Sequence, residues 1–184
     1  MSKIIIQSEQ VYFRLICYDD IDNGWLDWIN NPTLNKYLVS STITRSDLIR
    51  YLDDSKPPLV YMFAVCLIEN DRYIGNARLS LVDRINKKCI YGRLLGGENV
   101  HGRGIGTEVL ILLANYAFYI LNLNKIETQV IAKNIASVRS NIKAGAIQEG
   151  LLRESEIING TYEDVACFGI LRSDYNKGNG KKLL

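Results

Sequence analysis

The 184-residue sequence lacks the features of a membrane or secreted protein. No apolar run approaches the roughly 18 to 20 residues that a membrane-spanning helix needs. The apolar stretch at residues 4–6 is too short, and its surroundings too weakly basic, for a signal peptide. An excess of positive charge is also absent, because 22 Lys and Arg residues against 20 Asp and Glu residues leave a net charge of +2. We therefore expect a cytoplasmic protein that binds neither membranes nor nucleic acid.

Histidine and closely spaced cysteines are scarce as well. The sequence contains one histidine, His101, and no two of its cysteines are separated by only two residues, the spacing typical of zinc and haem sites. We therefore expect no bound metal. Apolar residues flank the cysteines, and we interpret all of them as reduced packing residues rather than disulfide partners. The cysteines are Cys17, Cys66, Cys89 and Cys167.

Proline is also rare, with three residues in the chain, whereas apolar residues make up 47% of it and charged residues 23%. This composition is typical of a globular protein and excludes a disordered or low-complexity one. The length suffices for one domain of ordinary size. We expect that domain to span residues 1–175, followed by a flexible polar tail over residues 176–184.

The first half of the chain predicts two short helices and a series of antiparallel strands. Asp19 or Asp20 is expected to cap the first helix, which ends near Pro32. The second helix is expected to begin after Thr44, where Asp47 completes a pattern close to a capping box. Turn signals about ten residues apart separate the strands of the meander. These strands are expected over residues 4–6, 11–15, 59–69, 73–82 and 88–95.

The second half of the chain begins with a change of period. Apolar residues recur at helical spacing over residues 105–120, and a strand over residues 125–132 follows. Because a long helix joins this strand to that over residues 88–95, we expect the two strands to be parallel, with a right-handed crossover. The sequence thus predicts an α/β fold, with a mixed sheet and helices on both faces. The remaining elements are expected to be a helix over residues 135–144 and two strands that reach Tyr175 through a hairpin turn at Asn159-Gly160.

Three glycines at alternate positions precede the long helix, in the segment His101-Gly102-Arg103-Gly104-Ile105-Gly106-Thr107. Glycine permits positive φ and lets a ligand approach the backbone closely. Successive N–H groups at the start of a helix suit a pyrophosphate, and Arg103 adds a positive charge. The P-loop pattern and the Rossmann glycine spacing are both absent. A glycine-rich turn that binds no ligand remains the alternative.

This segment resembles the acyl-CoA loop of the GNAT N-acetyltransferases, with Gly104 and Gly106 at the family's glycine positions and His101 where Gln or Arg is usual. Two further motifs are similar to those of the branch that contains the ribosomal-protein alanine N-acetyltransferases. The first comprises Asn134, Ser137, Lys143 and Gly145, and the second comprises the segment Glu149-Gly150-Leu151-Leu152-Arg153 followed by Asn159-Gly160 and Asp164. The resemblance covers residues 11–175, and three motifs in the right order make it specific.

The resemblance implies a GNAT-like fold, in which a mixed, mostly antiparallel sheet splays between its fourth and fifth strands, here residues 88–95 and 125–132. It also implies acetyl-CoA as co-substrate, with the pantetheine arm between the splayed strands. Main-chain groups around Leu94, Leu95 and Gly96 are expected to bond this arm. Asn134 is expected to bond it from the other side, to cap the following helix, or to do both. The other residues expected to bind the coenzyme are His101, Gly102, Arg103, Gly104, Ile105, Gly106, Thr107 and Lys143.

The resemblance implies direct transfer of an acetyl group to an amine, although two common catalytic residues are missing. Where many relatives have a Tyr near the leaving sulfur, this sequence has Asn141, which can donate a hydrogen bond. Ser137 and Ser140 are alternative donors, and the thiolate could also leave unaided. Where many relatives have a Glu base, this sequence has Ile90. The candidate bases are Glu98, Glu156, Glu154 and Asp83, and a water relay is a further possibility.

In this family the acceptor amine binds between the first two helices and the last hairpin. The W-x-N-x-P pattern at residues 28–32 is similar to that of enzymes that acetylate nucleotide-linked amino sugars, and aromatic and amide groups suit a sugar ring. Simple burial of one helix face by the two tryptophans, Trp25 and Trp28, is the alternative interpretation. The residues expected to bind the acceptor are Trp28, Asn30, Tyr37 and Tyr91.

Other acceptors and functions remain open at this point. A protein N-terminal amine is the second candidate, and a non-catalytic acyl-CoA-binding module is the third. A polyamine is less favoured, because acidic residues are not clustered within residues 25–50. By analogy with the family, the last strands could pair in a homodimer.

Overall fold

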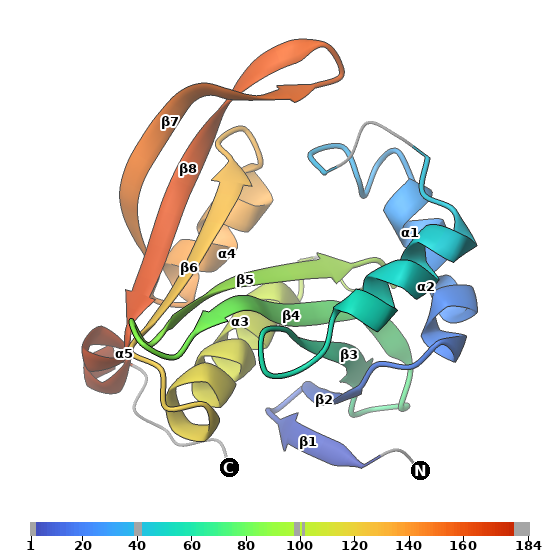
Figure 1. Cartoon of the computed structure of the whole chain (residues 1–184), viewed down its shortest axis with the longest axis horizontal. Coiled ribbons are helices and arrows are strands. Elements are labelled where there is room, and N and C mark those ends of the chain that lie inside the picture. Colours follow the sequence, from blue (N-terminus) through green and yellow to red (C-terminus); the bar gives the residue numbers. More distant parts are fainter. Residues whose placement is uncertain (1–2, 39–41, 98–99, 101, 179–184) are drawn as a thin grey trace.

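A computed structural model describes residues 3–38, 42–97, 100 and 102–178. An eight-stranded sheet with the strand order β1-β2-β3-β4-β5-β6-β8-β7 forms its centre (Figure 1). The strands are β1 Ile4–Gln7, β2 Val11–Leu15, β3 Tyr61–Leu67, β4 Tyr73–Asp83, β5 Lys88–Leu95, β6 Lys125–Ile131, β7 Ile147–Ile158 and β8 Thr161–Leu171. The helices are α1 Leu26–Asn30, α2 Arg45–Asp54, α3 Ile105–Asn115, α4 Ile135–Lys143 and α5 Arg172–Gly178. Short π-helical turns, Ile21–Trp25 and Tyr116–Ile120, precede α1 and extend α3.

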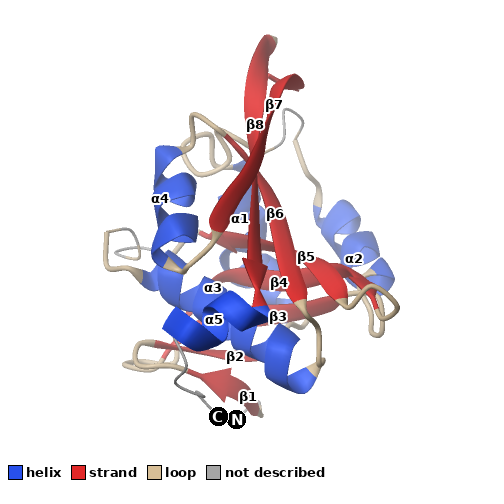
Figure 2. Ribbon diagram, turned by 90° about the vertical axis from the view of Figure 1, so that its left-hand side faces the viewer, coloured by secondary structure: helices blue, strands red, loops and turns tan. Residues whose placement is uncertain are grey.

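The sheet is mixed, as predicted. Strands β1 to β5 pair antiparallel in chain order, β5 and β6 are parallel, and β6, β8 and β7 are again antiparallel. Helix α3 forms the crossover between β5 and β6, and the long β7–β8 hairpin rises beyond the rest of the sheet (Figures 1 and 2). The predicted α/β class and the parallel pair in the middle of the sheet are therefore confirmed.

Strands β5 and β6 run side by side only at their first residues. Residues 88–90 pair with residues 125–127, and beyond them the two strands diverge (Figure 1). A side-chain hydrogen bond from Thr128 Oγ1 to the main-chain oxygen of Tyr91, at 3.2 Å, lies at the start of the gap. The splay predicted for these two strands is thus confirmed.

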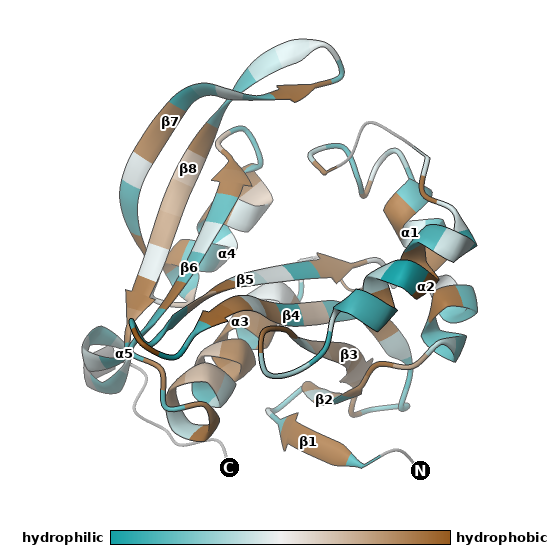
Figure 3. Ribbon diagram, in the orientation of Figure 1, coloured by the Kyte–Doolittle hydropathy of each residue, from teal (hydrophilic) through white to brown (hydrophobic). Residues whose placement is uncertain are grey.

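Two hydrophobic clusters hold helices to the sheet. The larger one joins α3 to the strands and contains a stacked pair, Phe13 and Phe63, with ring centres 5.3 Å apart. The smaller one joins α2 and the first helical turn to β3, and consists of Ile21, Trp25, Leu48, Leu52 and Met62. Figure 3 shows the contrast between the mainly hydrophobic α3 and the largely hydrophilic α2, which buries only one side.

Helix α2 begins at the predicted capping box. Thr44 Oγ1 accepts a hydrogen bond from the N–H of Asp47 at 3.2 Å, and Asp47 Oδ2 accepts one from the N–H of Thr44 at 2.9 Å. Two N–H groups that an uncapped helix would leave without partners are satisfied in this way.

The cap predicted for the first helix does not form. Asp20 occupies the N-cap position, but its carboxylate oxygens accept hydrogen bonds from Arg14 at 2.8 and 2.5 Å and from the N–H of Cys17 at 2.9 Å. Asp20 is almost fully buried, so the ion pair with Arg14 supplies the partner that a buried carboxylate requires. The prediction of a side-chain cap at this position is wrong for that reason.

The chain also ends differently from the prediction. Strand β8 stops at Leu171, and α5 follows instead of a continued strand to Tyr175. Tyr175 is buried against Phe118, with ring centres 5.5 Å apart, and the N–H of Arg172 donates to the main-chain oxygen of Asn124 at 2.8 Å. These contacts turn the chain away from the sheet. Helix α5 includes residues 176–178, which the sequence assigns to the tail, and residues 179–184 lie outside the described residues.

The cysteines are all free, as expected. Cys66 and Cys89 are buried in the core, whereas Cys17 is exposed, so the packing role expected of every cysteine is wrong for Cys17. In the described part of the chain, no helix is long and apolar enough to span a membrane.

Candidate active site

The glycine turn before α3 leaves open space beside a helix N-terminus. Gly102 and Gly104 both have φ of +82°, a conformation that glycine adopts without strain. A Cβ atom at either position would meet none of the described atoms within 4 Å. Gly104 is the N-cap of α3, and its carbonyl accepts hydrogen bonds from the N–H groups of Thr107 and Glu108. The preceding N–H groups have no intrahelical acceptor, and this arrangement suits an anion.

Two side chains of this turn, Arg103 and His101, were expected to bind the coenzyme, and the structure describes only Arg103. The Arg103 guanidinium donates to the carboxylate of Glu69, at 3.3 and 3.5 Å, so a phosphate contact would have to compete with this exposed ion pair. His101 and the candidate base Glu98 lie outside the described residues.

Helices α3 and α4 and strand β5 meet at Gly106, the second residue of α3. A Cβ atom at this residue would lie 3.3 Å from Ser140 Oγ on α4, 3.5 Å from Arg93 Nε and 3.8 Å from Leu95 Cδ1 on β5. The next residue, Thr107, has its hydroxyl 3.3 Å from that of Ser140. Helix α3 therefore approaches β5 and α4 closely at the wide end of the splay.

The edge of β5 that faces the splay has main-chain groups without a neighbouring strand. Tyr91 turns its carbonyl toward β6, where Thr128 donates to it. Because successive residues of a strand turn their main-chain groups to opposite edges, Arg93 and Leu95 turn theirs to the same edge as Tyr91. The β5–β6 pairing ends before these two residues. The intervening Leu94 bonds toward β4, and the N–H of Gly96 donates to the carbonyl of Ile74 at 3.0 Å.

Asn141 of α4 is fully buried beside this edge. Its Oδ1 accepts hydrogen bonds from Tyr91 Oη at 2.6 Å and from Arg93 Nη1 at 3.3 Å. Burial raises the pKa of Tyr91 to about 12, so its hydroxyl remains protonated and acts as a donor. Asn141 Nδ2 has no hydrogen-bond partner among the described residues. A buried amide donor thus remains available next to the gap between β5 and β6.

The other residues predicted on α4 have less buried positions. Asn134 Oδ1 accepts a hydrogen bond from the N–H of Ser137 at 3.2 Å, which confirms that Asn134 caps the helix. Ser137 is half-buried and Lys143 is exposed at the other end of the helix. Contacts of these residues with a coenzyme stay predictions.

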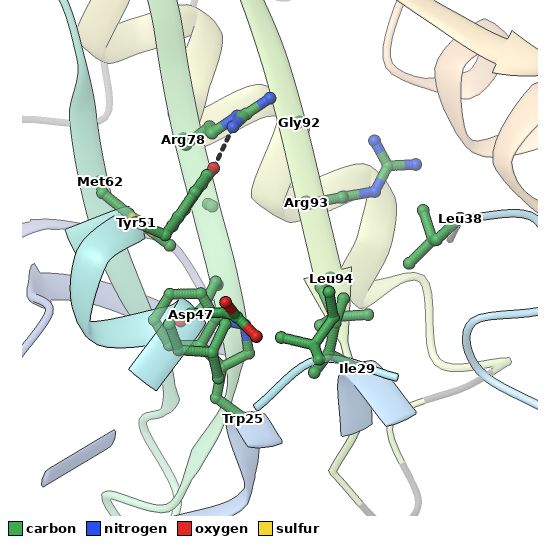
Figure 4. Close-up of a pocket in the computed structure, with 14 residues that line it drawn as sticks. Trp25, Ile29, Leu38, Asp47, Tyr51, Met62, Arg78, Gly92, Arg93 and Leu94 are labelled. Atoms are coloured by element: carbon green, nitrogen blue, oxygen red, sulfur yellow. Dashed lines mark hydrogen bonds between the residues drawn. The ribbon is translucent and has the colours of Figure 1, made fainter. Parts of the chain in front are cut away.

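A cavity of about 520 Å³ lies on the other face of β4 and β5, beneath α1 and α2 (Figure 4). Its wall is largely apolar and includes Trp25, Leu48 and Leu94. Polar groups enter it from three elements: Asp47 and Tyr51 from α2, Asn76 and Arg78 from β4, and Arg93 from β5. Gly92, Arg93 and Leu94 of this lining belong to β5, the strand that borders the gap between β5 and β6. The cavity and that gap are therefore separated only by β5.

Asp47 is the carboxylate that lines this cavity in the described part of the chain. Hydrogen bonds from Thr44, with a further one from Arg50 at 2.5 Å, lower the pKa of Asp47 to about 2. The group is therefore ionised near neutral pH and a poor proton acceptor.

The residues predicted to bind the acceptor are spread around the cavity rather than gathered in it. Trp28 packs on Tyr73, with ring centres 5.0 Å apart, and covers Gly96, where a Cβ atom would overlap the indole. Tyr37 lies beside Lys36, whose ammonium is 5.2 Å from its ring centre. Tyr91 is on the opposite face of the strand, bonded to Asn141.

Asn30 uses its side chain to connect two segments of the chain. Its Nδ2 donates to the carbonyls of Leu26 and Ile43, at 3.0 and 2.8 Å, and its Oδ1 accepts from the N–H of Ile43 at 2.9 Å. Most of the hydrogen-bonding capacity of this amide is therefore used within the fold. Asn30 shapes the loop between α1 and α2, and a contact with an acceptor stays a prediction.

The candidate bases are also dispersed. Glu156 is exposed on β7, where it pairs across the hairpin with Glu163. The N–H of Glu154 donates to Asp164 Oδ1 at 2.8 Å in the same hairpin. Asp83 accepts hydrogen bonds in the β4–β5 turn, which lies at the opposite end of β5 from Leu95, and those bonds lower its pKa.

Several polar residues of the cavity were missed by sequence reasoning. Asn76 and Arg78 are two residues apart on β4 and share one face, and Tyr51 reaches them from α2. Their signal in the sequence is weak: polar residues at alternate positions of an otherwise apolar strand, which a solvent-facing edge would explain equally well.

Comparison with known proteins connects this geometry to a family. Residues 10–147 match the model of the acetyltransferase (GNAT) domain. The chain is 29% identical over 175 residues to "Uncharacterized N-acetyltransferase p20" of Bacillus licheniformis, covering 92% of this chain and 97% of the relative. It is 32% identical over 130 residues to "Probable N-acetyltransferase YjcK" of Bacillus subtilis (strain 168), covering 71% and 72%.

Among solved structures, a similar fold is that of the spermidine N-acetyltransferase from Vibrio cholerae in complex with CoA and spermine. The TM-score is 0.82, with 24% sequence identity, over 91% of this chain and 99% of that chain. At this identity the similarity shows a common fold.

Proposed function

The chain belongs to the GNAT family of N-acetyltransferases, and from this premise we propose that it moves the acetyl group of acetyl-CoA to a primary amine held in the cavity beneath α1 and α2. The observation that carries the proposal is the unpaired edge of β5 at Arg93 and Leu95, beside the unpartnered Nδ2 of Asn141. An extended arm can add to such an edge as an extra strand does.

The residues present fit the coenzyme. Acetyl-CoA, when bound, supplies an acetyl group activated as a thioester. The N-terminus of α3, with Gly102 and Gly104, holds the negative charge of the diphosphate. The main-chain groups of Arg93 and Leu95 hold the pantetheine and orient the thioester, because directed N–H groups in a dry site need no reorganisation during the reaction. The structure of the Vibrio cholerae relative in complex with CoA supports this use of the fold.

Asn141 has the position to assist the leaving group. Its Oδ1 is held by Tyr91 and Arg93, which leaves Nδ2 as a donor directed away from both. A hydrogen bond from Nδ2 to the departing sulfur stabilises the negative charge on it. Asn141 holds no acidic proton, so the thiolate takes its proton from water, as a thiol of ordinary pKa permits.

The cavity is the natural place for the acceptor amine. It meets β5 at residues 92–94, on the face opposite to Asn141, so an amine in the cavity can approach the splay from the other side of the strand. Proximity of this kind replaces much of the entropic barrier to transfer. Asp47 has too low a pKa to deprotonate an ammonium, so the amine reacts in the fraction that is already neutral.

The features described so far do not select one class of acceptor amine. The pattern at residues 28–32 favours a nucleotide-linked amino sugar, but Trp28 and Asn30 have internal partners, and neither the family match nor the similar structure points to a sugar. The similar enzyme from Vibrio cholerae acts on spermidine. A nucleotide-linked amino sugar, a peptide N-terminus and a polyamine therefore form the first substrate panel.

Two measurements test the proposed function. Calorimetry with CoA measures binding, and release of free thiol from acetyl-CoA measures transfer to each amine of the panel. We expect CoA to bind and at least one primary amine to be acetylated. Tight CoA binding without turnover of any amine would reject the enzyme and favour a non-catalytic acyl-CoA-binding module. Failure to bind CoA would reject both.

A further inference from the structure

Arg78 brings a guanidinium group into the wall of the cavity without a carboxylate to neutralise it. Its Nη1 donates to the hydroxyl of Tyr51, and its central carbon lies 5.6 Å from the centre of the Tyr51 ring. None of the ion pairs formed among the described residues includes Arg78. Because a guanidinium group carries five N–H donors, most of them remain available to a bound group.

Asn76 places a second donor in the same wall. The residue is 4% exposed, and its Oδ1 accepts a hydrogen bond from Tyr73 Oη at 2.6 Å. Its Nδ2 is buried without a partner among the described residues. Asn76 precedes Arg78 by two residues on β4, so both side chains lie on the face that borders the cavity.

The neighbouring strand leaves room for Arg78. Gly92 pairs with Arg78 across the sheet, and a Cβ atom at Gly92 would lie 3.6 Å from Arg78 Nε. In Figure 4, Arg78 reaches from β4 toward β5 beside Gly92, and Arg93 leaves β5 on its other side. The Arg93 guanidinium is bonded to Asn141 Oδ1, at 3.3 Å, so Arg78 is the arginine directed along the cavity wall.

The single carboxylate among the described lining residues is already engaged and does not pair with Arg78. Asp47 already accepts hydrogen bonds from Thr44 on one oxygen and from Arg50 on the other. A substrate with several ammonium groups would therefore meet the Arg78 guanidinium and no unengaged carboxylate. An oxyanion, in contrast, pairs with a planar guanidinium in a charge-assisted, often bidentate geometry.

We propose that the acceptor carries an oxyanion, either a carboxylate or a phosphate, in addition to its amine, and that Arg78 and Asn76 bind this group. The proposal deepens the proposed function and rests on it, because it takes the cavity as the acceptor site. It assigns Arg78 a role in substrate choice, separate from the acetyl transfer at the splay.

The test compares amines that differ in one anionic group. D-Glucosamine is paired with D-glucosamine 6-phosphate, L-alaninamide with L-alanine, and spermidine serves as the polycation. Each kcat/KM value is calculated from the concentration of the unprotonated amine, so that differences in amine pKa do not affect the comparison. We expect the anionic member of at least one pair to exceed its neutral partner by about tenfold or more, and spermidine to be the poorest substrate. The phosphate and carboxylate pairs show which oxyanion is preferred.

Variants assign the preference to Arg78. Arg78→Met is expected to bring kcat/KM for the anionic and neutral members of the preferred pair to within about twofold, because it lowers the value for the anionic amine far more than that for the neutral one. Arg78→Lys is expected to retain part of the preference, because it keeps the charge without the planar fork. Arg84→Met, in the turn that follows β4 and outside the cavity lining, is the matched control and should keep the full preference.

The outcomes separate this proposal from the proposed function. No turnover of any amine, with CoA bound, rejects the proposed function itself. Turnover of neutral amines or spermidine that equals or exceeds that of the anionic amines rejects the oxyanion proposal alone, as does an equal loss for all amines in Arg78→Met. If Arg78→Met does not fold, the preference of the wild-type enzyme and its decrease with ionic strength decide the question.

Discussion

The two faces of β5 differ in how they are built. On the face toward α3 and α4, Tyr91, Arg93 and Leu95 meet Asn141 and Gly106, and main-chain groups form much of the surface. On the other face, Gly92 and Leu94 border a cavity whose polar groups are side chains from α2 and β4.

This difference corresponds to two kinds of ligand: a coenzyme common to the family and an acceptor particular to one enzyme. The coenzyme proposed for the first face is the same for every member of the family, so the main-chain groups and glycines that would hold it can be identified from short motifs. Side chains on separate elements serve a particular acceptor, and they carry no fixed spacing in the sequence. We call the side of β5 with Tyr91, Arg93 and Leu95 the coenzyme face and the side with Gly92 and Leu94 the acceptor face. The following predictions test whether substitutions on one face leave the function proposed for the other unchanged.

The largest effect is expected at the glycines of the coenzyme face. Gly104→Glu and Gly106→Glu place a negative charge at the proposed diphosphate site, and at Gly106 the side chain also meets Ser140 and Arg93. We expect CoA affinity to fall by more than about 100-fold in folded protein. Calorimetry measures the affinity and circular dichroism the fold. Gly150→Glu, where a Cβ meets none of the described atoms, is the control. Unchanged CoA affinity in both variants would contradict the assignment.

Asn141→Ala is expected to have the next largest effect. It removes the donor proposed for the leaving sulfur, so kcat should fall about 100-fold while CoA affinity changes less. Tyr91→Phe, which leaves Asn141 in place but removes a bond to its Oδ1, should lower kcat to a smaller extent. Rapid-quench turnover and calorimetry give the two quantities. Equal losses of kcat and CoA affinity would instead indicate that Asn141 positions the coenzyme.

On the acceptor face, Asn30→Ala tests structure against binding. This amide connects α1 to the segment at Ile43, so its loss should lower the free energy of unfolding by about 1 to 3 kcal/mol. The KM for the amine should rise because the loop is displaced, and CoA affinity should be unchanged. Denaturant unfolding and steady-state kinetics measure these effects. A raised KM with unchanged stability would show that Asn30 binds the acceptor directly, as the sequence pattern predicts.

The smallest effect concerns the cap at the entrance to the cavity. Hydrogen bonds from Thr44 and Arg50 lower the pKa of Asp47 from 3.8 to about 2. Since the folded state favours the ionised form, this contribution to stability is complete above about pH 4 and is lost as the pH falls toward 2. Asp47→Asn should remove this part of the acid dependence, which urea unfolding at several pH values measures. The same acid dependence in the variant would contradict the role of the cap.

The sequence predicted the coenzyme face more fully than the acceptor face for physical reasons. The glycine turn and the capping residue Asn134 are local features, fixed by neighbours within a few residues, and the splay followed from the family resemblance. The partnership of Tyr91 and Asn141 joins residues 50 positions apart, so neither residue signals it alone.

Local patterns also failed where contacts with other elements decide the structure. Asp20 was expected to cap a helix, but Arg14, which lies on the preceding strand, binds its carboxylate. The strand expected to reach Tyr175 ends early, because Phe118 and Asn124 hold the following residues in a helix. Arg78 was not singled out at all, since its position in the cavity depends on Tyr51 and on the absence of a side chain at Gly92.

The short pairing between β5 and β6 has a consequence for how the molecule unfolds. Among the described residues, main-chain bonds join β5 to β6 at their first residues and in the turns just before them, near Lys87 and Asn124. Beyond that point, cohesion between the halves of the sheet depends largely on the apolar side chains that both present to α3. A molecule inserted along this seam completes a hydrogen-bond ladder that the polypeptide leaves unfinished. The two halves of the sheet should then unfold more cooperatively when CoA is present, which amide hydrogen exchange measures. The cellular concentration of the coenzyme would thus determine whether the halves open separately or together.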